Sequence, residues 1–303
     1  MLLDKGQEDD WFGSHFIVTL IVISATCLIS LVIWEWFNKA PIIDVRLFKN
    51  FNFAVSNMMM FFLGLMLFSS LVMMPQFLQT LLGYTAQSAG LVLSGSGVVL
   101  LIEMPIIGQL TSKYPAKYII SFGWLVLCCA MYYSTQRLDL SIGFRSAAWL
   151  RVAQGAGLGF LFVPITLACY IGIPPEKSNS VAGIVNFMRN IGSSVGTSMV
   201  TTLLARRAQV HQTNLVYHAT NFDPEFRNQL NGISQTLLQA GLSAPDARRQ
   251  AMGRLYQSVV GQAQTLAYID TFMILAIGAG IMFVLSFIIR KNDPGGGGEV
   301  AVG

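Results

Sequence analysis

Seven long apolar runs alternate with polar segments along this chain of 303 residues. A helix needs about 20 apolar residues to cross the hydrocarbon core of a bilayer, and each run approaches or exceeds that length. Since backbone polar groups in lipid must be paired within the segment, we interpret each run as one transmembrane helix. The sequence therefore predicts an all-α, polytopic membrane protein, with helices over residues 15–35, 51–74, 87–110, 117–135, 146–171, 181–204 and 266–289.

The segment 205–265 breaks this pattern, because it is polar and rich in Gln, Asn and Arg. Two stretches within it, near 224–240 and 244–262, have helical spacing, and the first carries an apolar stripe. The stripe consists of Leu230, Ile233, Leu237 and Leu238. We expect a helical extramembrane hairpin, which is either a solvated loop folded on itself or a docking surface for a partner in the cell envelope.

The composition excludes a soluble enzyme and a disordered chain. Hydrophobic residues make up 53% and charged residues 11% of the sequence, whereas soluble domains carry about 25% charged residues. The net charge of +4 does not indicate nucleic-acid binding, because the basic residues stand at the ends of apolar runs and form no patch. The cysteines lie inside apolar runs without metal-binding spacing, which favours small buried side chains. They are Cys27, Cys128, Cys129 and Cys169.

Lysine and arginine in short loops set the predicted orientation, since they favour the cytoplasmic side. If the seven helices alternate, the short segments on one side carry only Lys5, Arg137 and Arg145, and the arginines of the long segment 205–265 count little in this rule. The other side carries eight basic residues: Lys39, Arg46, Lys49, Lys113, Lys117, Lys177, Arg290 and Lys291. We therefore expect residues 1–14 to form a junction outside the cell and residues 290–303 to form a flexible cytoplasmic tail.

Two acidic residues inside apolar runs are candidates for carrying protons. Glu103 lies deep in the third run, where a charged carboxylate costs about 2.5 kcal/mol or more unless it is paired or hydrated. Such a group suits the uptake and release of protons; the alternative is a paired or protonated structural acid facing a polar interior. Asp270 opens the last run, where it is either an interfacial helix-start residue or a second proton carrier.

An arginine inside an apolar run needs a partner, because its guanidinium keeps its charge in proteins. Arg189 lies about nine residues into the sixth run, where it serves either a structural ion pair or direct contact with a substrate. Its predicted depth is similar to that of Glu103, so these two side chains are candidates for an ion pair. Arg151, near the outer end of the fifth run, is expected to extend to the membrane surface.

Small residues are dense in three of the runs, which is typical of helices that approach closely in lipid. Gly155 and Gly159 lie in the fifth run, and Gly192 and Gly196 form a GxxxG pair in the sixth. Simple packing is one interpretation, and a bundle with moving helices is the one we favour. The sequence holds no GxxxxGK[ST] motif, so ATP-driven transport within this chain is not expected.

Several collinear segments together resemble one family of membrane proteins. The sequence is similar to the EmrB/QacA-like transporters, which form the drug:proton antiporter branch of the major facilitator superfamily with fourteen helices. The resemblance covers almost the whole chain, and the long polar segment before the last helix fits it. The matching segments are LDKGQ at 3–7 with DWF at 10–12, PIID at 41–44 with LFKN at 47–50, PQ at 75–76, GYTA at 83–86, QGAGLG at 154–159 with Pro164, and Phe187 with Arg189, Gly192, Gly196 and Thr197.

This resemblance implies that residues 15–35 are the second of two extra central helices, and that 51–289 form the C-terminal six-helix bundle of the major facilitator fold. The C-terminal copy of the family's inner-loop motif then falls on Gly108, Lys113 and Lys117, with Ser112 in place of the usual acid. The six N-terminal helices have no counterpart here. We therefore expect a C-terminal half that is inactive unless it pairs with the missing half or with itself.

Two functions remain open. The first is proton-coupled efflux of amphiphilic or cationic drug-like compounds across the bacterial inner membrane, with Glu103 and Asp270 as proton-coupling candidates. Its substrate-path candidates are Arg189, Asn186, Phe187, Gln154, Phe160 and Met58. The second is a non-transporting seven-helix scaffold whose outer hairpin binds a partner, such as a periplasmic adaptor protein. No cofactor or metal is expected, and an enzyme is disfavoured because no nucleophile arrangement or zinc spacing occurs.

Overall fold

The computed structural model describes residues 15–38, 44–218 and 223–289, and all regular secondary structure in these ranges is helical. The expected outer junction 1–14 and tail 290–303 lie outside them. The all-α prediction is confirmed for the described chain. The elements are α2 (His15–Phe37), η2 (Val45–Lys49), α3 (Phe51–Thr80), α4 (Ala86–Lys113), α5 (Ala116–Arg137), α6 (Phe144–Tyr170), η3 (Pro175–Lys177), α7 (Ser178–His218), α8 (Pro224–Gln239) and α9 (Ala244–Ser286).

Local side-chain chemistry explains where several helices begin. The side chain of Asn50 accepts hydrogen bonds from the first backbone N–H groups of α3, and Thr85 does the same for α4. Asp223 and Ser243 cap α8 and α9. These residues satisfy N–H groups that have no partner within the helix, which is why Asn, Thr, Asp and Ser are favoured there. The connection between α3 and α4 turns at Gly83, whose φ of 68° suits glycine.

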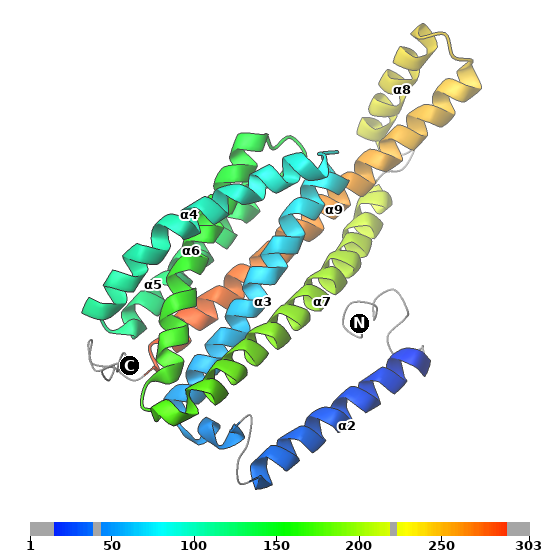
Figure 1. Cartoon of the computed structure of the whole chain (residues 1–303). Coiled ribbons are helices and arrows are strands. Elements are labelled where there is room, and N and C mark those ends of the chain that lie inside the picture. Colours follow the sequence, from blue (N-terminus) through cyan, green and yellow to red (C-terminus); the bar gives the residue numbers. More distant parts are fainter. Residues whose placement is uncertain (1–14, 39–43, 219–222, 290–303) are drawn as a thin grey trace.

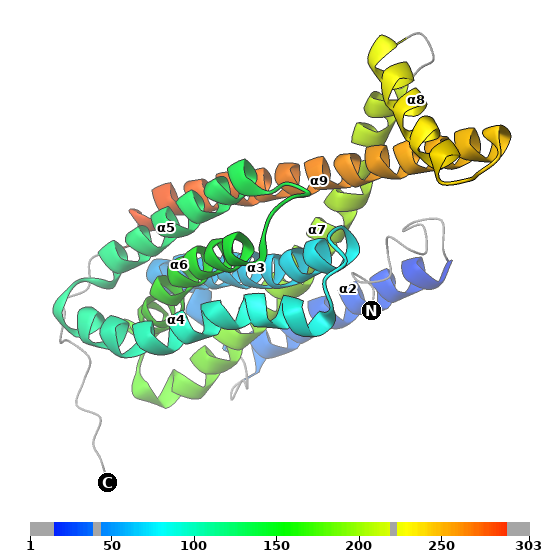
Figure 2. The same ribbon diagram turned by 90° about the horizontal axis from the view of Figure 1, so that it is seen from above.

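Six helices form a layered bundle. α6 and α3 pack side by side in its middle, α4 packs on α6, and α7 packs on α3. On the opposite side α5 packs on α6 and α9, and α9 also packs on α7 (Figures 1 and 2). The side of α3 and α6 away from α5 and α9 is therefore flanked by α4 and α7. Since α2 packs only on η2, no described helix covers this side, which we call the open face.

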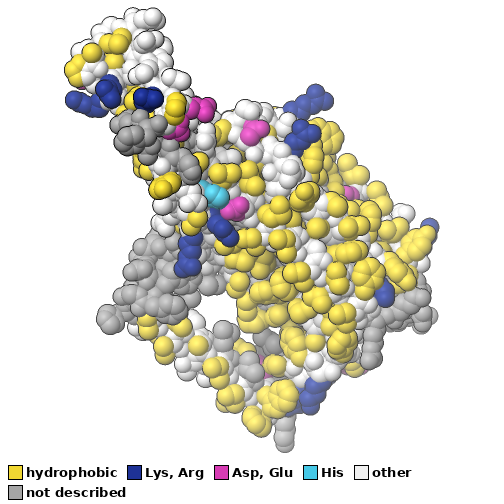
Figure 3. Space-filling model, turned by 180° about the vertical axis from the view of Figure 1, so that it is seen from behind, with side chains coloured by type: hydrophobic (Ala, Val, Ile, Leu, Met, Phe, Trp, Pro, Cys, Tyr) yellow, Lys and Arg dark blue, Asp and Glu magenta, His cyan; other side chains and the backbone are white. Residues whose placement is uncertain are grey.

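The surface of α5 and α9 is broadly hydrophobic. Figure 3 views the molecule from this side and shows apolar side chains over most of the bundle, with charged groups near its ends and on the projection. Leu125, Ile277, Ile281 and Val284 expose 42% to 64% of their surface there. So large an apolar surface belongs in a bilayer, where lipid chains cover it. The chain is thus a multi-pass membrane protein.

Five described helices are long and apolar enough to cross a membrane, namely α3, α4, α5, α6 and α9. α7 falls below this standard because polar residues recur along it, and the described apolar stretch of α2 is the shorter Ile21–Phe37. The count of seven spans therefore stays a prediction. The expectation of buried cysteines is correct for Cys169 but wrong for Cys27 and Cys129, which are exposed.

The segment predicted as a separate hairpin is built mainly from the ends of two long helices. α7 continues to His218 and α9 starts at Ala244, so both run without a break through the boundaries expected near residues 204 and 266. No proline interrupts either helix at those boundaries. α8 packs on the outer part of α9, with Leu230 and Leu237 buried and Leu238 exposed. We call α8 with the outer parts of α7 and α9 the projection (Figure 1).

Glycines bring α3 and α7 into backbone contact. A Cβ atom at Gly192 would overlap the carbonyl group of Phe61, and one at Gly196 would lie 2.6 Å from the carbonyl oxygen of Leu65. On α6, a Cβ at Gly155 would lie 2.7 Å from the Cβ of Ser96 on α4. Such close approach is available only without side chains, so these glycines set the spacing of the helices.

Gly192→Ala and Gly196→Ala should therefore destabilise the protein, by about 1–3 kcal/mol each, because backbone atoms of α3 must move. Gly183→Ala is the matched control, since Gly183 lies on the same helix with nothing within 4 Å of its Cβ position. That variant should be neutral or gain up to about 1 kcal/mol of helix propensity. Thermal unfolding in detergent measures the stability of the three variants. Equal unfolding midpoints would contradict the close packing of α7 on α3.

Candidate functional site

A polar stripe runs along α7. Hydrogen-bonding side chains recur at every third or fourth residue and so lie on one side of the helix. None of them is buried. Most of them donate to backbone carbonyls of α7 itself, as Ser193 does to Asn190 and Thr197 to Ser193. The stripe consists of Asn186, Asn190, Ser193, Thr197 and Thr201.

Arg189 stands beside this stripe. Its Nη2 donates to Oδ1 of Asn186 at 2.7 Å, and its guanidinium lies 5.4 Å from the ring centre of Phe162 on α6. Arg189 and Phe162 border a cavity of about 180 Å³ between α3, α6 and α7, which Leu63, Phe68 and Asn190 also line. Among the described residues no carboxylate lies within ion-pair distance of Arg189.

Glu103 lies on α4, where that helix packs against α6. Its carboxylate occupies the space that a side chain at Gly159 of α6 would fill. Oε2 is buried and finds no hydrogen-bond partner in the described part of the chain. The considered ion pair between Glu103 and Arg189 does not form within this chain. Their depths are similar, as expected, but α6 and α3 separate the helices that carry them.

The remaining substrate-path candidates divide between the surface and the interior. Met58 and Phe187 expose 37% and 41% of their surface, and Asn186 is also exposed. Phe160 instead stacks edge-on against Phe122 of α5, at 5.1 Å between ring centres, on another side of α6. Gln154 is fully buried. The aromatic group beside Arg189 is Phe162, which lies two residues from Phe160 and so points to another side of the helix.

Arg151 does not reach the membrane surface, so that expectation is wrong. It is 3% exposed, and its Nη1 donates to Oγ of Ser70 at 2.6 Å and to Oε1 of Gln154 at 3.1 Å. Gln154 in turn donates to Oγ of Ser134 at 2.9 Å. Ser70 belongs to α3 and Gln154 to α6 itself, and Gln154 extends the network to Ser134 of α5. Nε of Arg151 has no hydrogen-bond partner in the described part of the chain.

Asp270 is not a helix-start residue, since α9 begins far before it at Ala244. Its Oδ2 lies 2.8 Å from Nε2 of His211 and 3.7 Å from Nε of Arg207, both on α7. The carboxylate therefore links α7 to α9 near the base of the projection. No sequence pattern indicated His211, because its pairing with Asp270 depends on two helices that are distant along the chain.

The expected inner-loop motif lies at the connection of α4 and α5. Lys113 ends α4, and Lys117 donates to the carbonyl oxygen of Phe287 at 3.4 Å, close to the end of α9. Gly108 has open space at its Cβ position. Ser112, which replaces the family's acid, donates to the carbonyl of Gln109 in its own helix.

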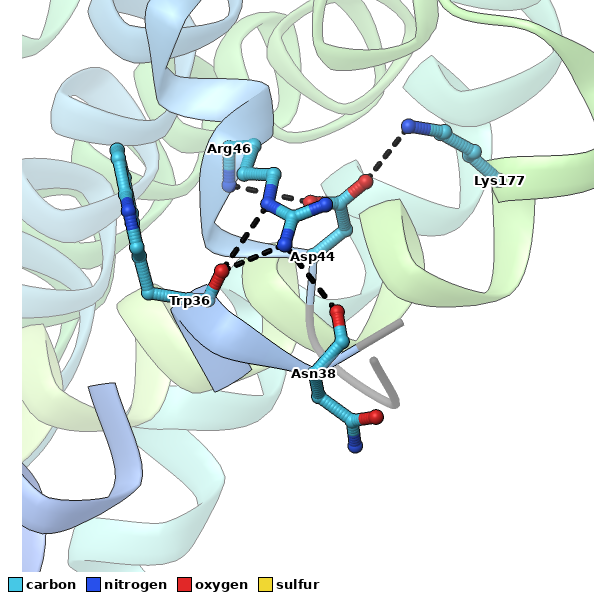
Figure 4. A network of polar contacts seen from close by, with 5 residues as sticks. All are labelled: Trp36, Asn38, Asp44, Arg46 and Lys177. Atoms are coloured by element: carbon cyan, nitrogen blue, oxygen red, sulfur yellow. Dashed lines mark hydrogen bonds and ion pairs between the residues drawn. The ribbon is translucent and has the colours of Figure 1, made fainter. Parts of the chain in front are cut away.

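A polar junction joins the end of α2 to the bundle on the predicted inner side (Figure 4). Oδ2 of Asp44 accepts a hydrogen bond from Nζ of Lys177 at 2.6 Å, and the guanidinium of Arg46 donates to the carbonyls of Trp36 and Asn38. Burial by itself would raise the pKa of Asp44, but its hydrogen bond and charge contact with Lys177, assisted by Arg46, hold that pKa below its ordinary value. From the sequence alone, only the sign of the charge on Asp44, Arg46 and Lys177 could be predicted.

Comparison with known proteins decides the family. The model of the family named Major Facilitator Superfamily matches residues 10–197. The chain belongs to this superfamily. The superfamily consists of secondary transporters rather than enzymes. The expected membership of this superfamily and the expected class of secondary transporter are therefore confirmed.

Several curated relatives of this superfamily member are named as drug-export or resistance proteins. It is 30% identical over 305 residues to the multidrug export protein EmrB of Escherichia coli, covering 98% of the chain and 57% of that protein. EmrB of Haemophilus influenzae is 32% identical, with 95% and 55% covered. The fatty acid resistance protein FarB of Neisseria gonorrhoeae is 30% identical, with 99% and 57% covered. The chain thus spans little more than half the length of these relatives.

A solved structure supports the same fold. A bacterial homologue of the human lysosomal transporter Spinster, in an inward-facing and unoccupied conformation, superposes with a TM-score of 0.56. The match covers 92% of this chain and 60% of that one, at 16% sequence identity. At this identity the likeness concerns the arrangement of helices alone.

Replacing Asp44 tests the inner junction through its pH dependence. Because the folded-state pKa lies below the ordinary value of 3.8, the pair stabilises the protein above about pH 4. That stability is lost as the pH falls through the folded-state pKa. Asp44→Asn should therefore cost about 1–2 kcal/mol at pH 7, and its gap to the wild type should narrow below pH 4.

Glu176→Gln is the control for this experiment, because Glu176 is an exposed neighbour of Lys177. Thermal unfolding of the three proteins between pH 7 and pH 3 gives the comparison. A gap for Asp44→Asn that stays constant over this range would contradict an ionised, paired carboxylate.

Proposed function

We propose that this chain is the C-terminal half of a proton-coupled exporter of amphiphilic drug-like compounds. The observation that carries the proposal is a pair of charged residues within the bundle, Arg189 on α7 and Glu103 between α4 and α6, for which the described residues supply no ion-pair partner. In a bilayer these groups need a water-filled path or a covering partner. The names of the relatives, multidrug export protein and fatty acid resistance protein, support efflux as the activity.

The open face would form one wall of an alternating-access path. In such transporters two halves of the membrane domain rock against each other around a site near the bilayer midplane. Residues 51–289 supply one bundle of this kind, and residues 15–35 would be an extra central helix. The length of the relatives beyond the matched part supports a complementary half as the opposite wall.

Each candidate residue has a proposed role in this wall. Glu103 takes up and releases the coupled proton, because its partly buried carboxylate lies between α4 and α6 and Oε2 has no hydrogen-bond partner among the described residues. Asp270 is a second proton-coupling candidate near the outer side. Arg189, Asn186, Phe187 and Met58 line the substrate path. Gly108, Lys113 and Lys117 would fix the inner ends of α4 and α5, and Gly155, Gly159, Gly192 and Gly196 would allow close packing of moving helices.

The proposed location is the bacterial inner membrane, with the N-terminus outside and the C-terminus in the cytoplasm. The excess of lysine and arginine on one side supports this orientation. The projection then stands on the periplasmic side. Its apolar cavity of about 770 Å³, lined by Val216, Phe226, Met252 and Tyr256 among others, supports a second role as the docking surface for a periplasmic adaptor protein.

Drug efflux from energised cells tests the proposed activity. We expect the chain to support efflux that depends on the proton gradient when its complementary wall is present, either a second copy or the N-terminal half of a related transporter. Glu103→Gln should reduce this efflux at least tenfold, because the glutamine amide neither binds nor releases a proton at the pH of the assay.

Glu176→Gln serves as the control, since it removes an exposed loop acid and should leave efflux unchanged. Expression of each variant is compared in membranes before the transport measurement. Full proton-dependent efflux by Glu103→Gln would remove Glu103 from the coupling step. No efflux in any combination would instead favour the non-transporting scaffold.

A further inference from the structure

A second cavity lies between α3, α7 and α9, at the ends of these helices on the proposed outer side (Figure 1). The three helices pack on one another, and the cavity between them has a volume of about 260 Å³. Pockets that enclose a whole drug-sized molecule measure about 300–1,000 Å³. This cavity therefore has room for one part of such a molecule.

The walls of this cavity are polar but uncharged. Hydrogen-bonding side chains come from all three helices, and leucine and alanine side chains of α7 and α9 form the rest. None of the described residues that line the cavity carries a charge. The hydrogen-bonding residues are Gln76 and Thr80 on α3, Thr201 on α7, and Gln264 and Tyr268 on α9.

The two glutamine side chains supply unused hydrogen-bonding groups. Thr80 and Thr201 donate to backbone carbonyls of their own helices, and Tyr268 is hydrogen-bonded to Thr80. The amides of Gln76 and Gln264 have no hydrogen-bond partner in the described ranges. Each amide offers both donors and an acceptor, so α3 and α9 present free donors and acceptors to one cavity.

The helices around the cavity are braced, and the charges of the brace are paired with one another. Asp270 of α9 lies 2.8 Å from His211 and 3.7 Å from Arg207, both on α7. Tyr268 packs edge-on against Phe77 of α3, at 5.2 Å between ring centres. The cavity is thus held open by three fixed helices, and its lining offers no opposite charge to an ionic group.

The cavity lies at the end of the polar stripe of α7. Thr201, the last residue of that stripe, lines it, whereas Asn190 of the same stripe lines the cavity beside Arg189. Eleven positions separate Asn190 from Thr201, which corresponds to about 16 Å along the helix. The stripe therefore runs from a cavity with a cationic side chain to a cavity without charge.

We propose that the outer cavity is a subsite for the uncharged, hydrogen-bonding head of an amphiphilic compound, with the amides of Gln76 and Gln264 as its specificity-determining contacts. This inference rests on the proposed function, because it names a chemical class of exported compound and a place on its route. An amide or hydroxyl head bonds to both glutamines, while the adjoining alkyl part packs on Leu204 and Ala208. A charged head is disfavoured, since it would lose water without gaining an opposite charge.

Photolabelling of the chain in lipid nanodiscs tests the subsite. The probe is decanamide with a diazirine in its alkyl chain, and the matching decanesulfonate and decyltrimethylammonium probes carry the two kinds of charged head. At equal concentration in the membrane, the amide should label peptides around the cavity about tenfold more strongly than either charged probe, and the labelling should saturate. Equal labelling by the three probes would overturn the inference.

Matched glutamine variants test the two contacts. Gln76→Leu and Gln264→Leu should each weaken labelling by the amide about tenfold, because the head then loses a hydrogen bond. Gln79→Leu and Gln262→Leu are the controls, since these exposed glutamines lie on the same two helices but do not line the cavity. Thermal unfolding checks that all four variants fold. Equal labelling of the four variants would overturn the two glutamines as specificity-determining contacts.

The outcomes separate the subsite from the proposed function. The labelling uses this chain alone, because α3, α7 and α9 supply every residue that the inference names. Proton-dependent efflux without labelling of the cavity would support the exporter and overturn the subsite. Labelling that depends on Gln76 and Gln264, but no efflux with any complementary half, would support the binding site and contradict the exporter.

Discussion

A polar side chain within a bilayer has to find another polar group, and this constraint organises the whole bundle. The chain meets it in three ways. Arg151 belongs to a hydrogen-bonded network of hydroxyl and amide groups from three helices. Asp44 and Arg46 satisfy their charges at the membrane edge, against Lys177 and the end of α2. On the stripe of α7, the side chains of Asn186, Ser193, Thr197 and Thr201 donate to backbone carbonyls of their own helix.

The architecture followed readily from the sequence because lipid imposes simple rules on length and composition. A run of apolar residues has few alternatives to a spanning helix, and the bounds of α3, α5 and α6 lie within a few residues of the runs that predicted them, except that α3 extends further at its end. The exception has a physical cause. Hydropathy registers where a helix enters water but not where it stops, so α3 and α7 continue beyond their predicted ends and α9 begins before its predicted start.

The direction in which an individual side chain points could not be predicted from the sequence in the same way. Arg151 and Arg189 are both arginines inside apolar runs, yet one is buried and the other borders an open cavity. Which outcome occurs depends on partners far along the chain, such as Ser70, which is 81 positions from Arg151. Phe160 and Phe162 illustrate the same point on a smaller scale, because a shift of two residues moves a ring to another side of its helix.

The continuity of α7 and α9 has a mechanical consequence. Their 41 and 43 residues correspond to rods of about 60 Å, which is twice the thickness of the hydrocarbon core. The portions inside and outside the membrane belong to the same rods, which are braced against each other by Asp270 and His211. A tilt of the bundle by a few degrees therefore swings the far tip of the projection through several ångströms. The projection would act as a lever that displays the state of the membrane domain to the outside.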